Sequence, residues 1–364
     1  MKLFSNEPIN RGRQIELDLA RGLAVLFMVL IHVQEYFANA AAKETNLAHV
    51  IDFLGGVPAA PVFMFLLGIG IIYTRKDSPR DFFRRGALLL LAGYGLNLLR
   101  GFLPNGLNFL VFKNGYYYEA AVGTLFYVDI FQFSGLAMMM FGLIKWKKPS
   151  NAVIAVSAVG LGVLNYLLSG LKVSSFGLSS FLSLFWGSSE LSFFPFLTWA
   201  FYPLAGYLFG TLLIRCTNKD RFYLLSFVSA ASALALGYYI FGYLLELEIG
   251  LSADYAYYHH QLLGNLLFTA FVIAWLSMFH LLGKVIPKPV GQTISRWSRN
   301  VSEIYFIHWL LIGWLASILQ YQLPLAHFVV LTHLILIVSD FLAEYVYLRK
   351  QMKKADSKEL SKSA

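Results

Sequence analysis

The chain has 364 residues, of which 58% are apolar and only 13% are charged, and its mean hydropathy is +0.61. A soluble globular protein carries about 25% charged residues, so the composition excludes a soluble fold. A net charge of +9 suits a nucleic-acid-binding protein, but the basic residues are distributed in a way that excludes this class. The single cysteine, Cys216, excludes an internal disulfide, and we expect no metal site.

Apolar stretches of about 20 residues recur along the chain and predict an all-α, polytopic membrane bundle of 10 to 11 transmembrane helices. We expect one transmembrane domain over residues 1–348 and a charged, disordered tail over 349–364. The predicted spans are 17–38, 52–74, 82–103, 120–145, 150–170, 190–215, 221–246, 261–284, 299–320 and 325–348.

Lysine and arginine gather in alternate connections between these spans. On one predicted side lie 24 of the 29 basic residues, and on the other lie only Lys43, Arg100, Lys113 and Lys172. This asymmetry predicts that both termini are cytoplasmic. The protein is therefore expected to be a multi-pass protein of a cell membrane, specifically the inner or cytoplasmic membrane of a bacterium, with the lipid bilayer and not nucleic acid as its partner.

The first span carries polar groups that a simple membrane anchor does not need. Arg21 and His32 are eleven residues apart, which places them within about 20° of one helix face and about 16 Å apart along the axis. Asp18 lies about 40° from His32 in the same projection. Asp18 and Arg21 also suit a plain ion pair at the helix entry.

Two later stretches depart from regular helix. The second span contains Pro58 and Pro61 and should be kinked or broken, with freed backbone groups lining a cavity. The Ser-rich stretch 171–189 should be interfacial or re-entrant. Asp129 falls in the fourth span, and Asp340 in the tenth, where interhelical hydrogen bonds are the simplest role.

A second polar wall is predicted in the ninth span. Ser302, Tyr305 and His308 follow at intervals of three residues and drift slowly around one side of a helix. Such a stripe serves either polar packing or one wall of a site. Another histidine, His49, falls in a predicted outer loop.

Three sequence segments resemble the transmembrane acyltransferase superfamily. They are Leu17-Asp-Leu-Ala-Arg-Gly-Leu-Ala24 ending at His32, Ala60-Pro-Val-Phe-Met-Phe-Leu-Leu-Gly68 before a basic loop, and Ile304-Tyr-Phe-Ile-His308. The resemblance is to heparan-alpha-glucosaminide N-acetyltransferase-like proteins and to the broader acyltransferase-3 group. The resemblance covers residues 13–100, and a second, short region of similarity lies at 295–310.

The resemblance implies an integral membrane acyltransferase. Such an enzyme takes an acetyl or other short acyl group from a coenzyme A thioester, here acetyl-CoA, on the cytosolic side. It passes the group to a hydroxyl or amine of a glycan or cell-envelope acceptor, often on the far side. A homodimer is a further expectation for its partners.

The resemblance assigns the catalytic histidine in two ways. The acyltransferase-3 pattern places it at His32, where it serves as general base or acyl carrier, whereas the heparan-type pattern places it at His49. The motif arginine maps to Arg21. His308 and Asp18 complete the set of catalytic candidates.

The chemistry of acyl transfer assigns further residues. An imidazole can deprotonate the acceptor near neutral pH. Tyr305 and Ser302 can donate hydrogen bonds to the developing oxyanion, next to the bound donor. Basic groups that cluster on the predicted cytoplasmic side are suited to the phosphates of coenzyme A, namely Arg75, Lys76, Arg84 and Arg85. The positive-inside rule is the other explanation for these residues.

A transporter or flippase is the alternative function. Asp129, Asp340 and His308 would then form an intramembrane path for protons or substrate. The two halves of the sequence contain no matched pair of broken helices, which favours the enzyme.

Overall fold

A computed structural model describes residues 2–75, 77–246, 255–319 and 322–363. The predicted all-α membrane bundle is confirmed: the described regular elements are helices. Those of the first half are α1 (Ile15–Phe37), α2 (Ala40–Lys43), α3 (Asn46–Gly55), α4 (Ala60–Tyr73), α5 (Pro79–Asn97), the π-helix η1 (Leu98–Phe102), α6 (Leu103–Phe112), α7 (Gly115–Leu125), α8 (Ile130–Lys147) and α9 (Asn151–Leu168). Those of the second half are α10 (Phe176–Leu182), α11 (Phe196–Trp199), α12 (Phe201–Leu213), α13 (Lys219–Gly237), the π-helix η2 (Tyr238–Leu244), α14 (Tyr255–Tyr258), α15 (Leu262–Val285), α16 (Lys288–Arg299), α17 (Val301–Leu319) and α18 (Leu325–Ser363).

Eight helical stretches in the described part of the chain are long and apolar enough to cross a membrane. Two predicted spans are not among them. One is α1, which carries acidic residues in its first turn, and the other is α8, which ends in lysines. With these two, the helices correspond to the ten spans predicted from the sequence.

The predicted break in the second span is present. Helix α3 ends at Gly55 and α4 begins at Ala60, with Pro61 in its first turn. The Gly56 carbonyl at the break accepts a hydrogen bond of 3.0 Å from the Tyr257 hydroxyl. The same carbonyl accepts a bond of 3.0 Å from the Ala59 N–H, so a backbone turn and a distant side chain together satisfy it.

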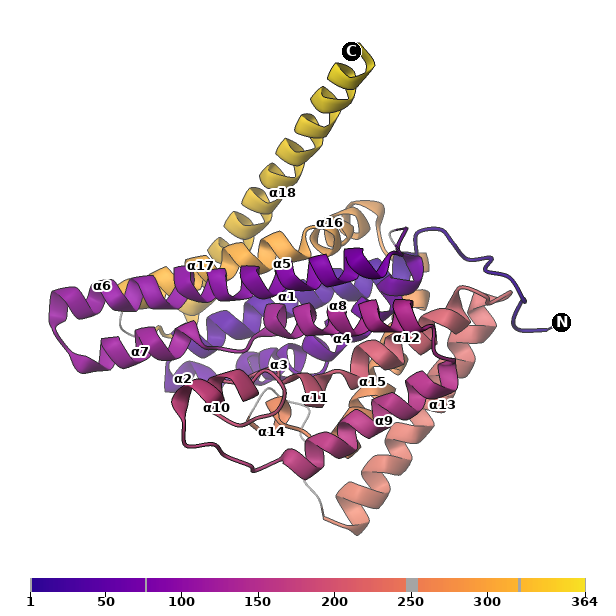
Figure 1. Cartoon of the computed structure of the whole chain (residues 1–364), viewed down its shortest axis with the longest axis horizontal. Helices are drawn as coiled ribbons and strands as arrows, with labels where there is room; N and C mark the ends of the chain where they lie inside the picture. Colours follow the sequence, from indigo (N-terminus) through magenta and orange to yellow (C-terminus); the bar gives the residue numbers. More distant parts are fainter. Residues whose placement is uncertain (1, 76, 247–254, 320–321, 364) are drawn as a thin grey trace.

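The third and fourth spans differ from the predicted boundaries. Helix α5 continues through η1 into α6, and Pro104 comes just after the wider π-helical turn of η1. Helices α6 and α7 form a hairpin at one end of the molecule (Figure 1). The fourth span is interrupted, and Asp129 is the N-cap of α8 instead of a mid-helix residue.

The C-terminal segment 349–364 was predicted to be disordered, and the structure differs. Helix α18 continues to Ser363, and its last turns stand away from the other helices (Figure 1). The segment contains five Lys and no Gly or Pro, which permits helix. An already formed helix N-terminal to it removes the cost of nucleation.

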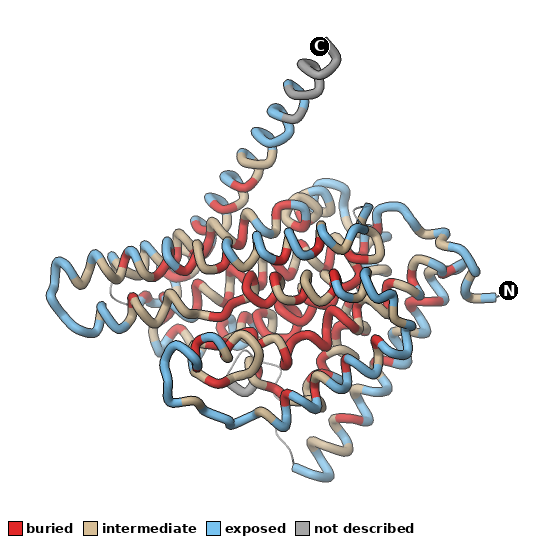
Figure 2. The backbone as a smooth tube through the Cα atoms, in the orientation of Figure 1, coloured by how far each residue is buried: buried red, intermediate tan, exposed pale blue. Residues whose placement is uncertain are grey.

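Helix α1 lies at the centre of the bundle. It packs against α3, α4, α15, α16, α17 and α18. The buried positions in Figure 2 concentrate along this central region, whereas the outer helices expose most of their residues. Residues on α1 are therefore positioned on several sides by neighbouring helices.

Candidate active site

Helices α1 and α17 bring two histidines together inside the bundle. His32 Nδ1 lies 3.0 Å from His308 Nε2, and the ring planes differ by 7°. His308 is fully buried, and its Nδ1 lies 2.9 Å from the Ile304 carbonyl oxygen one turn earlier. The predicted polar wall of the ninth span thus faces His32.

The hydrogen bonds fix the tautomers of this pair when both imidazoles are neutral. A carbonyl oxygen only accepts, so His308 Nδ1 must carry the proton and donate to Ile304. His308 Nε2 then accepts from the Nδ1–H of His32. The Nε2 of His32 is left unprotonated, which is the form that a general base requires.

A buried ion pair lies next to the histidines. Arg100 Nη2 bonds Asp129 Oδ2 at 2.7 Å, and the two side chains are only 7% and 10% exposed. The Arg100 guanidinium carbon lies 4.1 Å from the centre of the Trp309 ring, and His32 packs on the same ring at 4.3 Å. Trp309 therefore connects the imidazole to the guanidinium.

The π-helix η1 and a glycine bring Arg100 into the interior. A wider turn in a helix rotates the following side chains and often marks a functional position. A Cβ atom on Gly313 of α17 would lie only 2.9 Å from the Arg100 carbonyl carbon, so a larger residue would push η1 away. The second arm of this guanidinium, Nη1, is buried and has no hydrogen-bond partner among the described residues.

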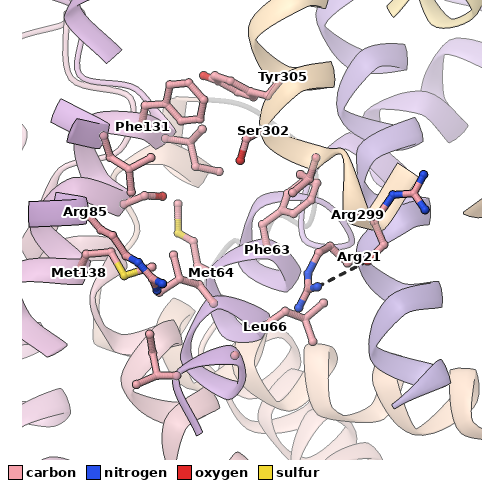
Figure 3. Close-up of a pocket in the computed structure, with 18 of the residues that line it drawn as sticks. Arg21, Phe63, Met64, Leu66, Arg85, Phe131, Met138, Arg299, Ser302 and Tyr305 are labelled. Atoms are coloured by element: carbon pink, nitrogen blue, oxygen red, sulfur yellow. Dashed lines mark hydrogen bonds between the residues drawn. The ribbon is translucent and has the colours of Figure 1, made fainter. Parts of the chain in front are cut away.

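A cavity of about 480 Å³ opens on one side of the histidines, and we call it the arginine cavity. Arg21 and Arg85 point into one end of it from opposite walls, while Ser302 and Tyr305 lie at the other end (Figure 3). The guanidinium of Arg299 is directed away from the cavity in Figure 3 and bonds Glu344 at 2.6 Å. Apolar side chains form the remaining walls, including Phe63, Met64, Leu66 and Met138.

A narrow space, which we call the waist, adjoins the arginine cavity. Its volume is about 30 Å³, enough for one or two water molecules, and His32 and Asp129 line it. The two cavities share four lining residues, namely Met28, Phe63, Ile130 and Tyr305. The waist therefore continues the arginine cavity toward His32.

A third cavity of about 460 Å³ lies beyond the ion pair, beside the α6–α7 hairpin, and we call it the tyrosine vestibule. Arg100 and Trp309 form its floor. Its walls carry amide and phenol groups from Asn105, Asn108, Tyr116, Tyr117 and Tyr127. Aromatic rings and amides on one concave surface offer both stacking faces and hydrogen-bonding groups.

Other residues predicted for the site lie apart from the histidine pair. His49 is exposed on α3 and lines none of these cavities. Asp18 bonds Arg13 and accepts a hydrogen bond of 3.1 Å from Ser298, about 21 Å along α1 from His32.

The predicted basic cluster is divided. Arg85 lines the arginine cavity, whereas Arg75 and Arg84 are exposed and line none of the three cavities. Lys76 lies outside the described residues. Arg21 is 3.5 Å from Ser298 Oγ, and Ser302 and Tyr305 line the cavity as predicted from their common face.

Sequence reasoning missed the roles of Arg100 and Trp309. Arg100 was assigned to the outer side because the third span was expected to end at residue 103. A positive charge in the apolar run 96–103, with Asp129 as an opposite charge one span later, was the available signal.

The comparisons with known proteins identify the family. The family model described as heparan-alpha-glucosaminide N-acetyltransferase, catalytic, matches residues 13–243, well over half of the chain. The chain belongs to this family. Neither the comparison with curated proteins nor that with solved structures found a match.

Membership of the heparan-alpha-glucosaminide N-acetyltransferase family makes this chain a membrane transferase of the acetyltransferase type. The match contains Arg21, His32, Arg100 and Asp129. His308, which orients His32, comes from α17, beyond the matched region. The site therefore combines the matched region with helices that follow it.

Proposed function

We propose that this protein transfers an acetyl group, or another short acyl group, from a coenzyme A thioester to a hydroxyl or amine of a glycan or cell-envelope acceptor. The donor binds in the arginine cavity, and the acceptor enters through the tyrosine vestibule. His32 at the junction acts as the general base. Under the predicted topology, the arginine cavity faces the cytoplasm.

The arginine cavity fits the donor in charge and shape. Arg21 and Arg85 stand where the phosphates of coenzyme A would need cations, and the apolar walls suit the thin pantetheine arm. Ser302 and Tyr305 lie at the end of the cavity nearest the waist. When bound, acetyl-CoA supplies an acetyl group activated as a thioester.

The proton movements follow from the histidine pair. His32 Nε2 takes the proton from the attacking hydroxyl or amine as the new bond to the acyl carbon forms. The carbon–sulfur bond then breaks, and His32 returns the proton to the departing thiolate. His308 holds the reactive tautomer throughout and carries part of the positive charge through its hydrogen bond.

The tyrosine vestibule supports an acceptor of glycan type. Sugars stack on aromatic rings through their apolar faces and bond amides through their hydroxyls, and both groups line this cavity. Arg100 Nη1, which has no partner among the described residues, is available to an oxygen of the acceptor or of the acyl group.

One observation carries the proposal: a single orientation-fixed histidine lies where the arginine cavity, through the waist, approaches the vestibule. Intramembrane histidines also serve as proton relays in transporters, so the histidine pair alone does not separate the two functions. Family membership favours the enzyme.

The test uses full-length protein in proteoliposomes with radiolabelled acetyl-CoA. Glucosamine serves as the amine probe and glucose as the hydroxyl probe, and acetylated product and released coenzyme A are both measured. We expect acceptor-dependent release of coenzyme A with matching product. If acetylated product and released coenzyme A both stay at the level of protein-free liposomes, the proposal is contradicted. Uptake of a probe without acetylation would favour the transporter.

A further inference from the structure

The waist and the tyrosine vestibule are separate cavities. No residue lines both of them in the part of the chain that the structure describes, whereas the waist shares four lining residues with the arginine cavity. His32 and Asp129 line the waist, and Arg100 and Trp309 line the vestibule. These four side chains form a partition between the two cavities.

Direct contacts close this partition. The ion pair between Arg100 and Asp129 spans it, with 2.7 Å between Nη2 and Oδ2. The Trp309 ring packs against the Arg100 guanidinium at 4.1 Å and against the His32 ring at 4.3 Å. Arg100 and Trp309 are each only 7% exposed. Contacts this close leave no space for a water molecule between the side chains.

Asp129 is the fixed half of the partition. It is the N-cap of α8, and its Oδ1 atom accepts a hydrogen bond of 2.7 Å from the Ile130 N–H. Its own N–H donates to Gln132 Oε1 at 3.2 Å. One carboxylate oxygen therefore caps the helix while the other holds Arg100. If Arg100 leaves, the cap still keeps Asp129 in place.

Arg100 and Trp309 are the halves that can move. The backbone next to Arg100 is held on α17, because the Leu99 carbonyl accepts a bond of 3.1 Å from the Trp314 indole. Gly313 of α17 also packs on the Arg100 backbone. With the backbone held, the partition opens by rotation of the two long side chains toward the vestibule.

Three hydrogen-bond donors at the partition are unused. Arg100 Nη1, the Tyr305 hydroxyl and Trp309 Nε1 are buried, and none makes a hydrogen bond of regular geometry to any described residue. Tyr305 lies close enough to the ion pair to interact with both of its members. Folded proteins leave few buried polar groups without a partner, because each one costs stability. The closed partition is therefore unfavourable for three groups at one point beside His32.

An entering acceptor relieves this unfavourable arrangement. When Arg100 and Trp309 turn toward the vestibule, their N–H groups can donate to hydroxyl oxygens of the acceptor. A ligand shifts a conformational equilibrium only through contacts that differ between the two states. The donors are unused in the closed state and bonded to the acceptor in the open state, so binding of a hydroxyl-rich acceptor favours opening.

We propose that Arg100, Asp129 and Trp309 form a gate between the donor and acceptor cavities. Closed, the gate keeps the two cavities apart; open, it lets the acceptor reach His32. The use of the gate in the reaction rests on the proposed function, in which the vestibule is the entrance for the acceptor. The closure itself rests on the cavities and the contacts alone.

Cysteine accessibility tests the gate. The native Cys216 is buried, and Cys216→Ser gives a cysteine-free background. In this background Ile130→Cys places a thiol between the waist and the arginine cavity, and Ala120→Cys places one in the vestibule. A small, charged methanethiosulfonate reagent that does not cross membranes is added to bacterial spheroplasts or to inverted vesicles that contain the full-length protein. The preparation in which Ala120→Cys reacts presents the vestibule side, and the other presents the arginine cavity.

With the gate unchanged, Ile130→Cys should react readily from the arginine-cavity side. From the vestibule side it should react at least about tenfold more slowly than Ala120→Cys, because the rate follows the fraction of open gate. Trp309→Ala removes the ring that fills the partition, and Asp129→Asn weakens the hold on Arg100 but can still cap α8. Each should raise the vestibule-side rate of Ile130→Cys at least about tenfold, whereas Trp309→Phe, which keeps a ring, should stay within about twofold.

Two results would overturn the proposal. One is a vestibule-side rate for Ile130→Cys that equals that of Ala120→Cys with the gate unchanged, which would mean an open passage. The other is an unchanged rate in both Trp309→Ala and Asp129→Asn. The Ala120→Cys rate is measured in each variant and should stay constant, which separates opening of the gate from general loss of structure. Labelling requires no acetyl transfer, so its outcome is independent of whether the proposed reaction occurs.

Discussion

The Nδ1 atom of His32 lies 3.0 Å from the Nε2 atom of His308, and the two imidazoles are stacked almost in parallel. The pair joins α1 and α17. Because His308 is itself anchored on the Ile304 carbonyl, the arrangement determines which nitrogen of His32 is free. The proposed reaction depends on these two hydrogen bonds.

The first prediction concerns His308 as a positioning residue. His308→Ala should lower kcat by about 10- to 100-fold, since His32 loses the acceptor that fixes its reactive tautomer, while KM for acetyl-CoA changes little. The pH profile of kcat should shift as well, which a purely structural defect would not cause. The measurement is a steady-state rate series in proteoliposomes.

His333→Ala is the matched control for that variant. His333 also lies on a long apolar helix, and its Nδ1 also lies 2.8 Å from the carbonyl oxygen four residues earlier, but it is exposed and lines none of the three cavities. Its activity should equal that of the unchanged protein. Equal losses for His308→Ala and His333→Ala would show that His308 has no special role.

The second prediction separates two neighbouring arginines. Arg85 lines the arginine cavity, whereas Arg84 is exposed and lines none of the three cavities. Arg85→Ala should raise KM for acetyl-CoA by about tenfold or more, because a hydrogen bond between charged groups contributes about 1.5–3 kcal/mol. Arg84→Ala should change KM less than about twofold. Similar effects at both positions would place the phosphates elsewhere.

The third prediction concerns the Arg100–Asp129 pair. Removing one partner leaves an uncompensated buried charge, which costs about 3–5 kcal/mol. Asp129→Asn and Arg100→Gln should each lower the midpoint of thermal unfolding in detergent. The double variant should be more stable than the sum of the two losses implies, because it leaves no lone charge. Additive losses would mean that the two side chains do not act as a pair.

The fourth prediction is a dependence of stability on pH. His260 lies between the membrane helices, and its Nε2 is 2.6 Å from the Tyr202 hydroxyl. Burial lowers the pKa of His260 from 6.5 to about 4. Between pH 6.5 and pH 4 this histidine is protonated in the unfolded chain but neutral in the folded protein. Its contribution to the free energy of unfolding is therefore fully present above pH 6.5 and decreases as the pH falls toward 4.

Through this one group, the free energy of unfolding changes by up to about 1.4 kcal/mol per pH unit. His260→Gln should flatten the fall of the unfolding midpoint between pH 6.5 and 4.5, whatever its effect at neutral pH. His49→Gln, at an exposed histidine, should leave the slope of the unchanged protein. An unaltered slope in His260→Gln would show that other groups control the acid sensitivity.

Much of the fold followed from the sequence, because bilayer thickness sets the length of an apolar helix. The ten predicted spans correspond to helices, and Pro61 correctly indicated the broken second span. The boundaries near residues 103 and 349 were less predictable. Near residue 349 helix propensity carries the helix past the apolar segment, and hydropathy does not measure that propensity. Near residue 103 the helix continues through Pro104 and Gly106, where α6 packs against α7 and α17.

The site was partly predictable for a related reason. Helical periodicity placed Arg21 with His32, and Ser302 and Tyr305 with His308, but it gives no information on which helices meet. The approach of α17 to α1, and of η1 to Gly313, depends on tertiary packing. For this reason the Arg100–Asp129 pair and its contact with Trp309 emerged only from the structure.

The most direct measurement is single-turnover acetyl transfer by His32→Gln, with binding of acetyl-CoA measured in the same preparation and His333→Gln as control. The account predicts that transfer falls by at least about 10²-fold, as expected for loss of a general base, while donor affinity stays within about threefold. Transfer at the rate of the unchanged protein, with normal donor binding, would contradict it.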